Sequence, residues 1–302
     1  MPAYLAEHSL EAAQQLIAGR TLTLEVRFTD QLGEPAAAAG TVTVGVTDAV
    51  GTEVLAAGTA TTADSTETGR YTRAVTPAQA ANPGWLVATW TDGTTTIVTH
   101  HELVGGVLFS VAEARAAEPD QLREDRYSAA EIQAARRAVE LEFEQITGVS
   151  FTRRYRRRRL DGDGTASLIL PEHEPAELRS VRAYSDATTY TAFTSDELAA
   201  VHLDPSGILT RLDGTTWPNG RANLLLEYVH GLAAPPPAVK QAAIRRARQV
   251  LGESRAAVPF NAISWTPDNG VTYRLSTPNA QRTGDPQIDA VLERYGWRPR
   301  PF

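Results

Sequence analysis

The pattern of hydrophobic and polar positions changes near residue 106. From Arg20 to Leu103, apolar residues alternate with polar ones in short runs rich in Thr and Val, with a turn signal about every dozen residues. This two-residue period indicates half-buried strands, because successive side chains of a strand point to opposite faces. We predict six or seven strands, with candidates at residues 21–28, 41–47, 53–61, 70–75, 85–90 and 95–101.

The aromatic residues of this segment fit a core between two sheets. Trp85 and Trp90 both lie in predicted strands, where they can fill such a core. Strands without helices over this length favour an immunoglobulin-like (Ig-like) β-sandwich. At the level of fold, Gly69–Tyr71 followed by Pro83–Trp85 resembles the Ig-like and fibronectin-like modules of surface and virion proteins. Ahead of the strands, Leu5–Ala18 is compatible with a short helix and equally with a flexible arm.

After residue 106 the pattern becomes helical. Ser110–Glu113 and Ser128–Glu131 each have the spacing of a capping box, in which the serine and glutamate side chains satisfy free backbone N–H groups at a helix start. The second box begins a helix whose apolar stripe recurs at spacings of three and four and ends at Gly148. We therefore predict a short helix before Pro119 and a longer one up to Gly148.

Strands and two further helices complete the chain. Strands are predicted at residues 150–160, 166–170, 178–184, 208–212 and 223–229. A helix follows Pro235–Pro237 with Gly252 just beyond it, and Asp285-Pro286 caps a last short helix after a long irregular stretch. The predicted fold class is two domains. Residues 1–106 form the leading arm or helix and an all-β Ig-like sandwich, and residues 107–302 form an α+β domain of helices with a small antiparallel sheet.

Composition and charge narrow the classes of protein. The absence of cysteine excludes disulfides, thiolate zinc sites and cysteine nucleophiles. The formal net charge of −7 lies wholly within residues 1–106, because the remainder holds 25 basic and 25 acidic residues. No apolar run approaches the roughly 18 residues that a bilayer span needs. We expect a soluble chain with no membrane partner and no export signal.

The sequence nominates no catalytic or metal site. His100, His101 and Glu102 end a predicted strand, where adjacent side chains diverge, so we interpret them as a solvated strand end. Asp161–Thr165 resembles the start of a calcium loop, but Ala166 occupies the position that needs glycine, and a hairpin turn explains the segment better. Nucleophile elbows and phosphate-binding or dinucleotide-binding glycine loops do not occur. We predict no enzyme activity, no metal and no cofactor.

A run of arginines is the most conspicuous local feature. Six of the seven positions from 153 to 159 are arginine, so a strand there would carry positive charge on both faces and project it outward. One hypothesis is contact with the DNA backbone, with Tyr155 as a stacking platform. The other is a protruding hairpin paired with acidic groups of a neighbouring protein. The candidate residues are Arg153, Arg154, Arg156, Arg157, Arg158 and Arg159.

The order of segments after residue 106 matches a known pattern. Helix starts in Phe109–Arg115 and Tyr127–Ile132 precede the arginine-bearing strand and a glycine turn at Leu160–Gly164. The segments that follow are Leu170-Pro171, Val181–Tyr184, Leu225–Gly231, Val239–Leu251 and Gly284–Tyr295. Together, over residues 107–302, they resemble the head-to-tail adaptor (connector) proteins of long-tailed bacteriophages. The N-terminal sandwich is an addition to the minimal adaptor of that family.

The resemblance implies a structural virion protein of the phage neck. Such a protein forms a ring of about twelve copies beneath the portal, extends the DNA channel and connects the capsid to the tail. The implied partners are the portal protein, neighbouring adaptor subunits, a head-completion (stopper) or tail protein, and the DNA that passes through the channel. The implied location is the virion neck, assembled in the host bacterial cytoplasm. The alternative function is a surface or glycan-binding module carried by the Ig-like domain.

The same resemblance suggests a docking role for the C-terminal tail. We expect the tail to bind the portal, with Trp297 and Phe302 as aromatic anchors, since aromatic residues commonly dominate interface energy. The alternative is a tail that packs on its own domain. The expected docking residues are Ile288, Val291, Leu292, Tyr295, Trp297 and Phe302.

Overall fold

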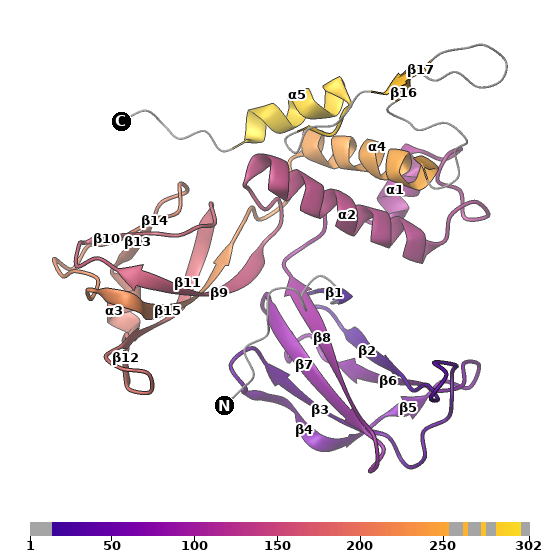
Figure 1. Ribbon diagram of the computed structural model, residues 1–302, viewed down its shortest axis with the longest axis horizontal. Helices are drawn as coiled ribbons and strands as arrows, with labels where there is room; N and C mark the ends of the chain where they lie inside the picture. The colour runs from indigo at the N-terminus through magenta and orange to yellow at the C-terminus, as the bar shows by residue number, and fades with distance from the viewer. Residues whose placement is uncertain (1–13, 254–261, 265–272, 276–281, 297–302) are drawn as a thin grey trace. The chain divides into compact units, whose positions relative to one another are not determined.

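The computed structural model describes residues 14–253, 262–264, 273–275 and 282–296 (Figure 1). The chain divides into two compact units. The first unit comprises Met1–Gly106 together with Arg154–Arg156, and the second comprises Val107–Arg153 and Arg157–Phe302. Each unit is described by itself.

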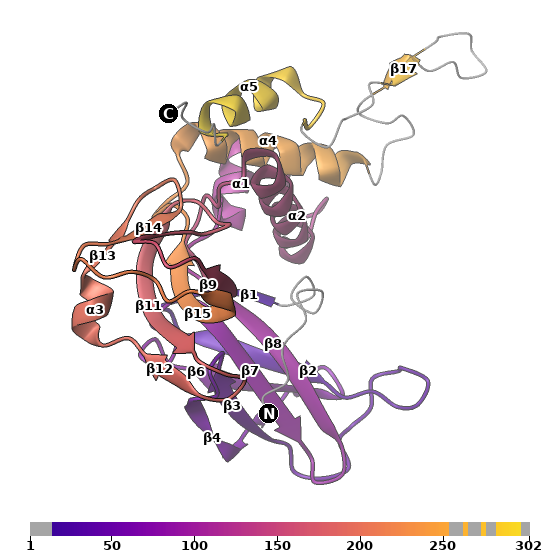
Figure 2. The ribbon, with the colours of Figure 1, turned by 60° about the vertical axis from the view of Figure 1, so that its left-hand side comes forward.

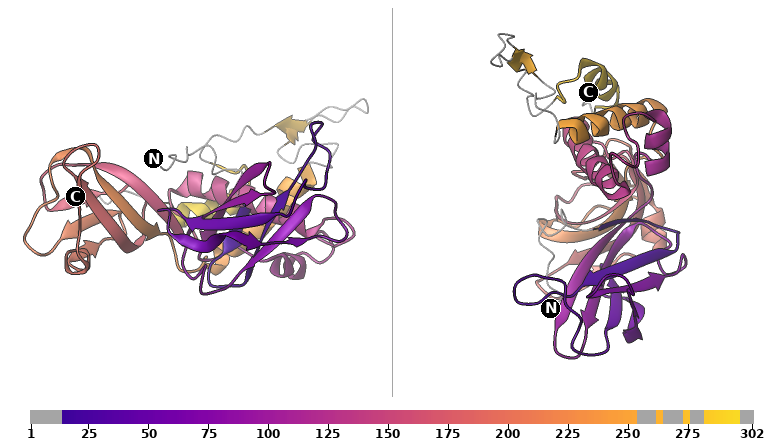
Figure 3. Two further views of the ribbon diagram at one scale, coloured as in Figure 1. Left: turned by 90° about the horizontal axis from the view of Figure 1, so that it is seen from below. Right: turned by 90° about the vertical axis from the view of Figure 1, so that its right-hand side faces the viewer.

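The described part of the first unit is built from strands in two layers (Figures 1 and 3). One sheet has five strands in the order β1-β8-β7-β3-β4, and the other has three in the order β2-β6-β5. The strands are β1 Gln14–Ile17, β2 Leu22–Arg27, β3 Thr43–Asp48, β4 Glu53–Ala60, β5 Thr62–Ala63, β6 Arg70–Val75, β7 Gly84–Thr91 and β8 Thr96–Val104.

The alternating pattern places one face of each sheet in a shared core. On β2, Leu22, Leu24 and Val26 are buried while the residues between them are more exposed. They pack with Val44 of β3 and Trp90 of β7 in one hydrophobic cluster. Strands occur at all six positions predicted for this segment. The two-residue period is clearest on β2 and β3, where buried residues alternate with more exposed ones.

The N-terminal end of the described chain differs from one of the two expectations for it. Residues 14–17 form the strand β1, which pairs in parallel with β8 and places Gln14 opposite His101. A helix reaching Ala18 is therefore wrong for these residues, since the free edge of β8 supplies hydrogen-bond partners that a local pattern cannot show. The earlier part of the predicted segment, Leu5 onward to residue 13, lies outside the described residues.

The second unit contains a group of packed helices (Figures 1 and 2). Both predicted capping boxes are confirmed, with Ser110 before α1 (Val111–Ala117) and Ser128 before α2 (Ala129–Thr147). Gly148 ends α2 in the left-handed conformation, with φ of 71°. The helices α4 (Pro237–Glu253) and α5 (Pro286–Tyr295) share one apolar core with α1 and α2. Gly252, predicted to follow α4, lies inside it.

The strands of the second unit form two small sheets and a separate strand pair. A four-stranded sheet has the order β12-β11-β15-β9, a three-stranded sheet has the order β10-β14-β13, and β16 pairs with β17. The strands are β9 Arg154–Gly162, β10 Ser167–Ile169, β11 Pro175–Tyr184, β12 Tyr190–Ala192, β13 Val201–Leu203, β14 Ile208–Arg211, β15 Gly220–His230, β16 Ala262–Ser264 and β17 Tyr273–Leu275; the short helix α3 spans Ser195–Ala199.

A second hydrophobic cluster joins the four-stranded and the three-stranded sheet. Leu224, Leu226 and Tyr228 of β15 pack with Leu209 of β14 and with Trp217. The expected hairpin between the arginine strand and the next strand is wrong, since β9 and β10 belong to different sheets. The mixed content of helices and strands agrees with the predicted fold class at a coarse level. None of the described helices has the length and apolar character to cross a membrane.

Candidate functional site: the arginine strand and its surroundings

The arginine run forms β9 and the residue before it, at one edge of the four-stranded sheet. Arg154 is only 3% exposed, Arg153, Arg156 and Arg158 are half-buried, and Arg157 and Arg159 are exposed. The expectation that the whole run projects outward is therefore wrong for Arg154. Neighbouring strands and carboxylates account for the difference, and none of them is adjacent to the run in sequence.

Arg158 is held by a carboxylate 14 residues further along the chain. Its Nε and Nη2 donate to Oε1 of Glu172 at 2.9 and 2.7 Å. The hydroxyl of Tyr228, on β15, donates to Oε2 of the same carboxylate. Glu172 is thus satisfied on both oxygens, and charge-assisted hydrogen bonds of this kind are the stronger class.

Arg157 faces a second buried carboxylate. Its Nε lies 3.5 Å from Oε1 of Glu227, a residue of β15 that is only 7% exposed. A carboxylate in that position loses hydration, and the guanidinium compensates part of the loss. Arg157 therefore contributes to holding β9 against β15 rather than presenting a fully free charge.

The first arginines of β9 belong to the first unit and share a single carboxylate there. Glu102 of β8 lies 4.0 Å from Nε of Arg154 and 3.7 Å from Nη1 of Arg156. Gln15 of β1 donates to the other oxygen of Glu102 at 3.3 Å. Glu102 is 7% exposed, so its negative charge is placed where two arginines can balance it.

Arg159 differs from the arginines before it on the strand. Its Nε donates to the backbone oxygen of Ala222 at 2.7 Å, and its guanidinium lies 4.3 Å from the ring centre of Tyr184. Tyr184 packs against Tyr190 with ring centres 5.2 Å apart, and Arg182 lies 5.2 Å from the ring centre of Tyr190. We call Arg159, Tyr184, Tyr190 and Arg182 the Arg–Tyr ladder.

The positive charges of the ladder are not balanced by a nearby carboxylate, whereas those of most other arginines of the run are. In the described part of the chain, neither Arg159 nor Arg182 has a carboxylate at ion-pair distance. Four other arginines of the run, by contrast, have one: Arg154, Arg156, Arg157 and Arg158. No local pattern in the sequence indicates this division, because the partner carboxylates lie 14 to 70 residues away along the chain. DNA contact by the run stays a prediction.

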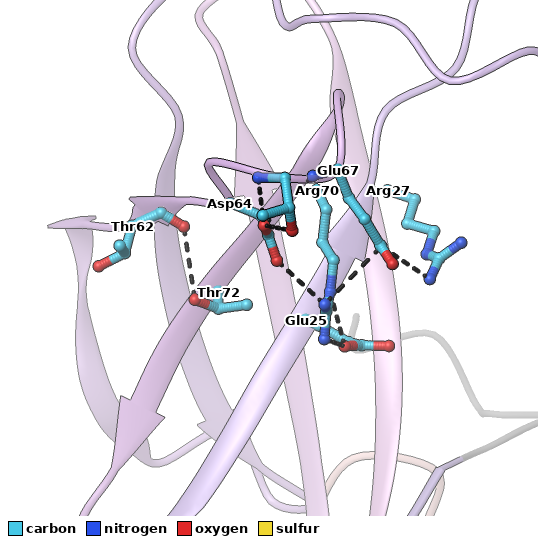
Figure 4. Close-up of polar contacts among 8 residues, drawn as sticks. Glu25, Arg27, Thr62, Asp64, Glu67, Arg70 and Thr72 are labelled. Atoms are coloured by element: carbon cyan, nitrogen blue, oxygen red, sulfur yellow. Dashed lines mark hydrogen bonds and ion pairs between the residues drawn. The ribbon is translucent and has the colours of Figure 1, made fainter. Parts of the chain in front are cut away.

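Figure 4 shows a different arrangement of charge in the first unit, where several carboxylates surround one arginine. Arg70 of β6 donates to Glu25 of β2 at 2.6 Å and to Asp64 at 3.0 Å. Glu67 lies 3.7 Å from Arg70 and also accepts from Arg27 at 3.1 Å. Hydrogen bonds from the side chain and backbone of Thr66 are the main reason that the pKa of Asp64 falls to about 2.

The histidine pair at the end of β8 lies in a different environment from the one expected. His101 is 2% exposed and Glu102 is 7% exposed, so the interpretation of a solvated strand end is wrong for these two residues. Burial, followed by the nearby His100, lowers the pKa of His101 to about 4. Thr99 accepts from the indole of Trp90 and contacts Nε2 of His101, both at 2.9 Å, so its hydroxyl can donate to a neutral imidazole. Among the described residues, no three metal-ligating side chains cluster.

The segment that resembled a calcium loop is a turn held by its own hydrogen bonds. Oδ1 of Asp163 accepts from the backbone and hydroxyl of Thr165, and Asp161 accepts from the backbone N–H of Ala222. The residue that would have been the last ligand, Glu172, is bound to Arg158 instead. These contacts support the interpretation of a structural turn.

The C-terminal helix α5 turns its apolar stripe toward its own unit. Ile288 and Leu292 are each 1% exposed and belong to the helical core, and Val291 and Tyr295 pack against it half-buried. Trp297 and Phe302 lie outside the described residues. Ile288 and Leu292 therefore agree with the alternative, a tail that packs on its own domain. A docking role for the tail stays a prediction and would have to use residues other than these two.

The aromatic residues of the first unit bear on the alternative of a glycan-binding module. Trp90 is fully buried, Trp85 packs against Tyr155, and Tyr71 meets Phe28 edge to face with ring centres 5.4 Å apart. Among the described residues of this unit, no aromatic side chain is exposed. The feature that would favour glycan binding, a cluster of solvent-facing aromatics, is thus missing from the described part.

No protein family model and no curated protein matches the chain. Among solved structures, it is similar to a chain from the neck of an empty GTA particle, with 16% identity, 64% of this chain and 91% of that chain covered, and a TM-score of 0.43. A chain from the virion of a native gene transfer agent (GTA) particle has 15% identity, the same coverages and a TM-score of 0.37. A chain from the neck of a native GTA particle has 17% identity, coverages of 65% and 96%, and a TM-score of 0.35.

Proposed function

We propose that the protein is a structural component of the neck of a phage-like particle. In this proposal, residues 107–302 form the adaptor domain of a ring beneath the portal, which extends the DNA channel and connects the capsid to the tail. The ring has about twelve copies. Residues 1–106 form an appended Ig-like sandwich, the portal and a stopper or tail protein are the flanking partners, and assembly takes place in the host cytoplasm.

The order and packing of elements in the second unit carry the proposal. Two capped helices, α1 and α2, lead into the arginine strand β9, and β10, β11, β15, α4 and α5 follow in the sequence that the adaptor resemblance requires. The helices α1, α2, α4 and α5 share one apolar core, which gives a rigid body suited to a ring subunit. The internal ion pairs of β9 also suit a channel wall, because a conduit must let DNA pass without holding it.

The test is association with the portal and with particles. The purified protein is mixed with the purified portal protein of the same particle, and complexes are separated by sedimentation and imaged. The proposal expects a ring of defined symmetry on the portal and the same chain in purified particles. The proposal is wrong if portal and protein do not associate and particles lack the chain. A monomer in isolation does not decide the matter, because the portal can serve as the template.

A further inference from the structure

Two surfaces of complementary chemistry carry charged groups that have no opposite partner among the described residues. One is the Arg–Tyr ladder on the four-stranded sheet of the second unit. The other is an acidic loop in the first unit, Asp30–Glu34, between β2 and β3. We propose that the ladder of one copy docks the Asp30–Glu34 loop of a second copy of this chain. The inference rests on the proposed function in so far as a ring places copies side by side.

The Asp30–Glu34 loop is a preformed protrusion with an apolar tip. Oδ1 of Asp30 accepts from the backbone N–H groups of Leu32 and Glu34 at 2.8 and 3.0 Å, and the N–H of Asp30 donates to the oxygen of Glu34 at 2.9 Å. Gly33 supplies the φ of 84° that the turn needs. Leu32 at the tip is 88% exposed, the highest value among the exposed large hydrophobic residues described.

The carboxylates on either side of that tip are available. Both Asp30 and Glu34 are exposed, and within the described residues neither has a basic group at ion-pair distance. Their situation contrasts with that of Glu25, which Arg70 of the same unit holds. The loop therefore presents a leucine between two carboxylates that have no basic partner among the described residues, on a backbone that is held by its own hydrogen bonds.

The ladder offers the matching set of groups. Tyr190 is 46% exposed and Tyr184 is half-buried, so part of the stacked pair of rings can cover an aliphatic side chain. Arg159 and Arg182 stack on those rings, which fixes their guanidinium planes and leaves N–H groups for a carboxylate. Because both surfaces are ordered beforehand, docking costs little side-chain entropy, and tyrosine with arginine is the composition of energetic interface centres.

Charge balance favours a protein partner here over nucleic acid. Residues 107–302 hold equal numbers of basic and acidic residues, and most arginines of β9 have ion-pair partners, so the described part of β9 offers little unpaired charge to a phosphate backbone. The first 106 residues carry the whole net charge of −7, so a second copy brings the required negative surface.

The test is a charge exchange in the full chain. Variant one carries Arg159→Glu with Arg182→Glu, and variant two carries Asp30→Arg with Glu34→Arg. Self-association is measured by sedimentation and by chemical cross-linking of the loop to the ladder. Each variant alone is expected to weaken self-association by about 100-fold, since like charges then oppose each other. An equimolar mixture of the two variants restores it, because every contact between unlike copies is again complementary.

Matched controls separate this contact from general charge effects. Arg294→Glu on α5 and Glu53→Arg on β4 change exposed groups outside both surfaces and are expected to leave self-association unchanged. Leu32→Ser removes the apolar tip without altering charge and is expected to weaken association by about tenfold. Circular dichroism and thermal unfolding confirm that each variant is folded.

Several results would overturn the inference. The first is that the two charge-reversal variants associate as strongly as the unmodified chain. The second is that a mixture of the two variants does not restore self-association. The third is that the unmodified chain forms no cross-link between loop and ladder at any concentration. Binding of duplex DNA that is lost in Arg159→Glu with Arg182→Glu would assign the ladder to nucleic acid instead. A chain that joins the portal but fails the charge exchange keeps the proposed function and loses this inference. A chain whose self-association follows the charge exchange but that does not bind the portal keeps this inference and loses the proposed function.

Discussion

Residues 1–106 carry the whole formal net charge of the chain, whereas residues 107–302 are neutral overall and most arginines of β9 have ion-pair partners. In the first, one arginine, Arg70, gathers several carboxylates while Asp30 and Glu34 remain in solvent. In the second, Glu172 and Glu227 each bind an arginine of β9. The difference teaches that a run of like charges in sequence and a free charged surface are separate properties.

The largest effect expected from this comparison concerns pH and the first unit. The pKa of His101 is about 4 in the folded chain because burial disfavours the charged imidazole, against 6.5 when unfolded. The unfolded state then binds more protons between these values, so stability is complete above pH 6.5 and falls as the pH drops toward 4. The loss is up to about 3 kcal/mol, at about 1.4 kcal/mol per pH unit.

Denaturant unfolding at a series of pH values from 7 to 4 measures that loss. His101→Gln is expected to flatten the pH dependence, whatever it does to stability at pH 7. His202→Gln, at an exposed position on β13 of the second unit, is the control and leaves the slope unchanged. An unchanged slope in His101→Gln would show that other groups carry the pH dependence.

The next effect is on the paired part of the arginine strand. Arg158→Ala removes the guanidinium that Glu172 binds at 2.7 Å, and the side chain of that carboxylate is only 13% exposed. We expect the second unit to lose about 2 kcal/mol of unfolding free energy, a value reduced because Arg158 itself is one-third exposed. Thermal and denaturant unfolding measure the change.

The smallest effect is expected one residue further along. Arg159→Ala removes a stacking contact and one backbone hydrogen bond from an exposed side chain, so the cost is below about 1 kcal/mol. The same unfolding measurements apply to this variant. If Arg158→Ala and Arg159→Ala lower the unfolding free energy equally, the contrast between the ion-paired arginines of β9 and the Arg–Tyr ladder is wrong.

Local signals in the sequence predict the elements well where the chain determines its own structure. The serine and glutamate of each capping box and the alternation on β2 depend on residues a few positions apart, so those elements are visible in advance. Helix α3 also carries such a signal, the box Thr194–Glu197, which the sequence reading overlooked. Its shortness, at five residues, left no apolar stripe to confirm it.

Features that depend on residues far apart in the chain could not be predicted from the sequence. Strand β1 exists because it pairs with the edge of β8, more than 80 residues away. The pairing of Arg158 with Glu172 and of Arg157 with Glu227 depends on how β9 lies beside β15. The inward stripe of α5 could be recognised as apolar, but only the fold shows that Leu292 covers its own core rather than a partner.

The salt dependence of DNA binding tests the central claim, that the arginine run of β9 is not a free basic surface. Binding of the full chain to a labelled duplex is measured between low and physiological salt. Each phosphate neutralised contributes about −0.9 to the slope of log affinity against log salt, so six free arginines would give about −5. The internal ion pairs predict a slope no steeper than about −2, or no measurable binding. A slope near −5 that Arg156→Ala, Arg157→Ala and Arg158→Ala each reduce would contradict the account.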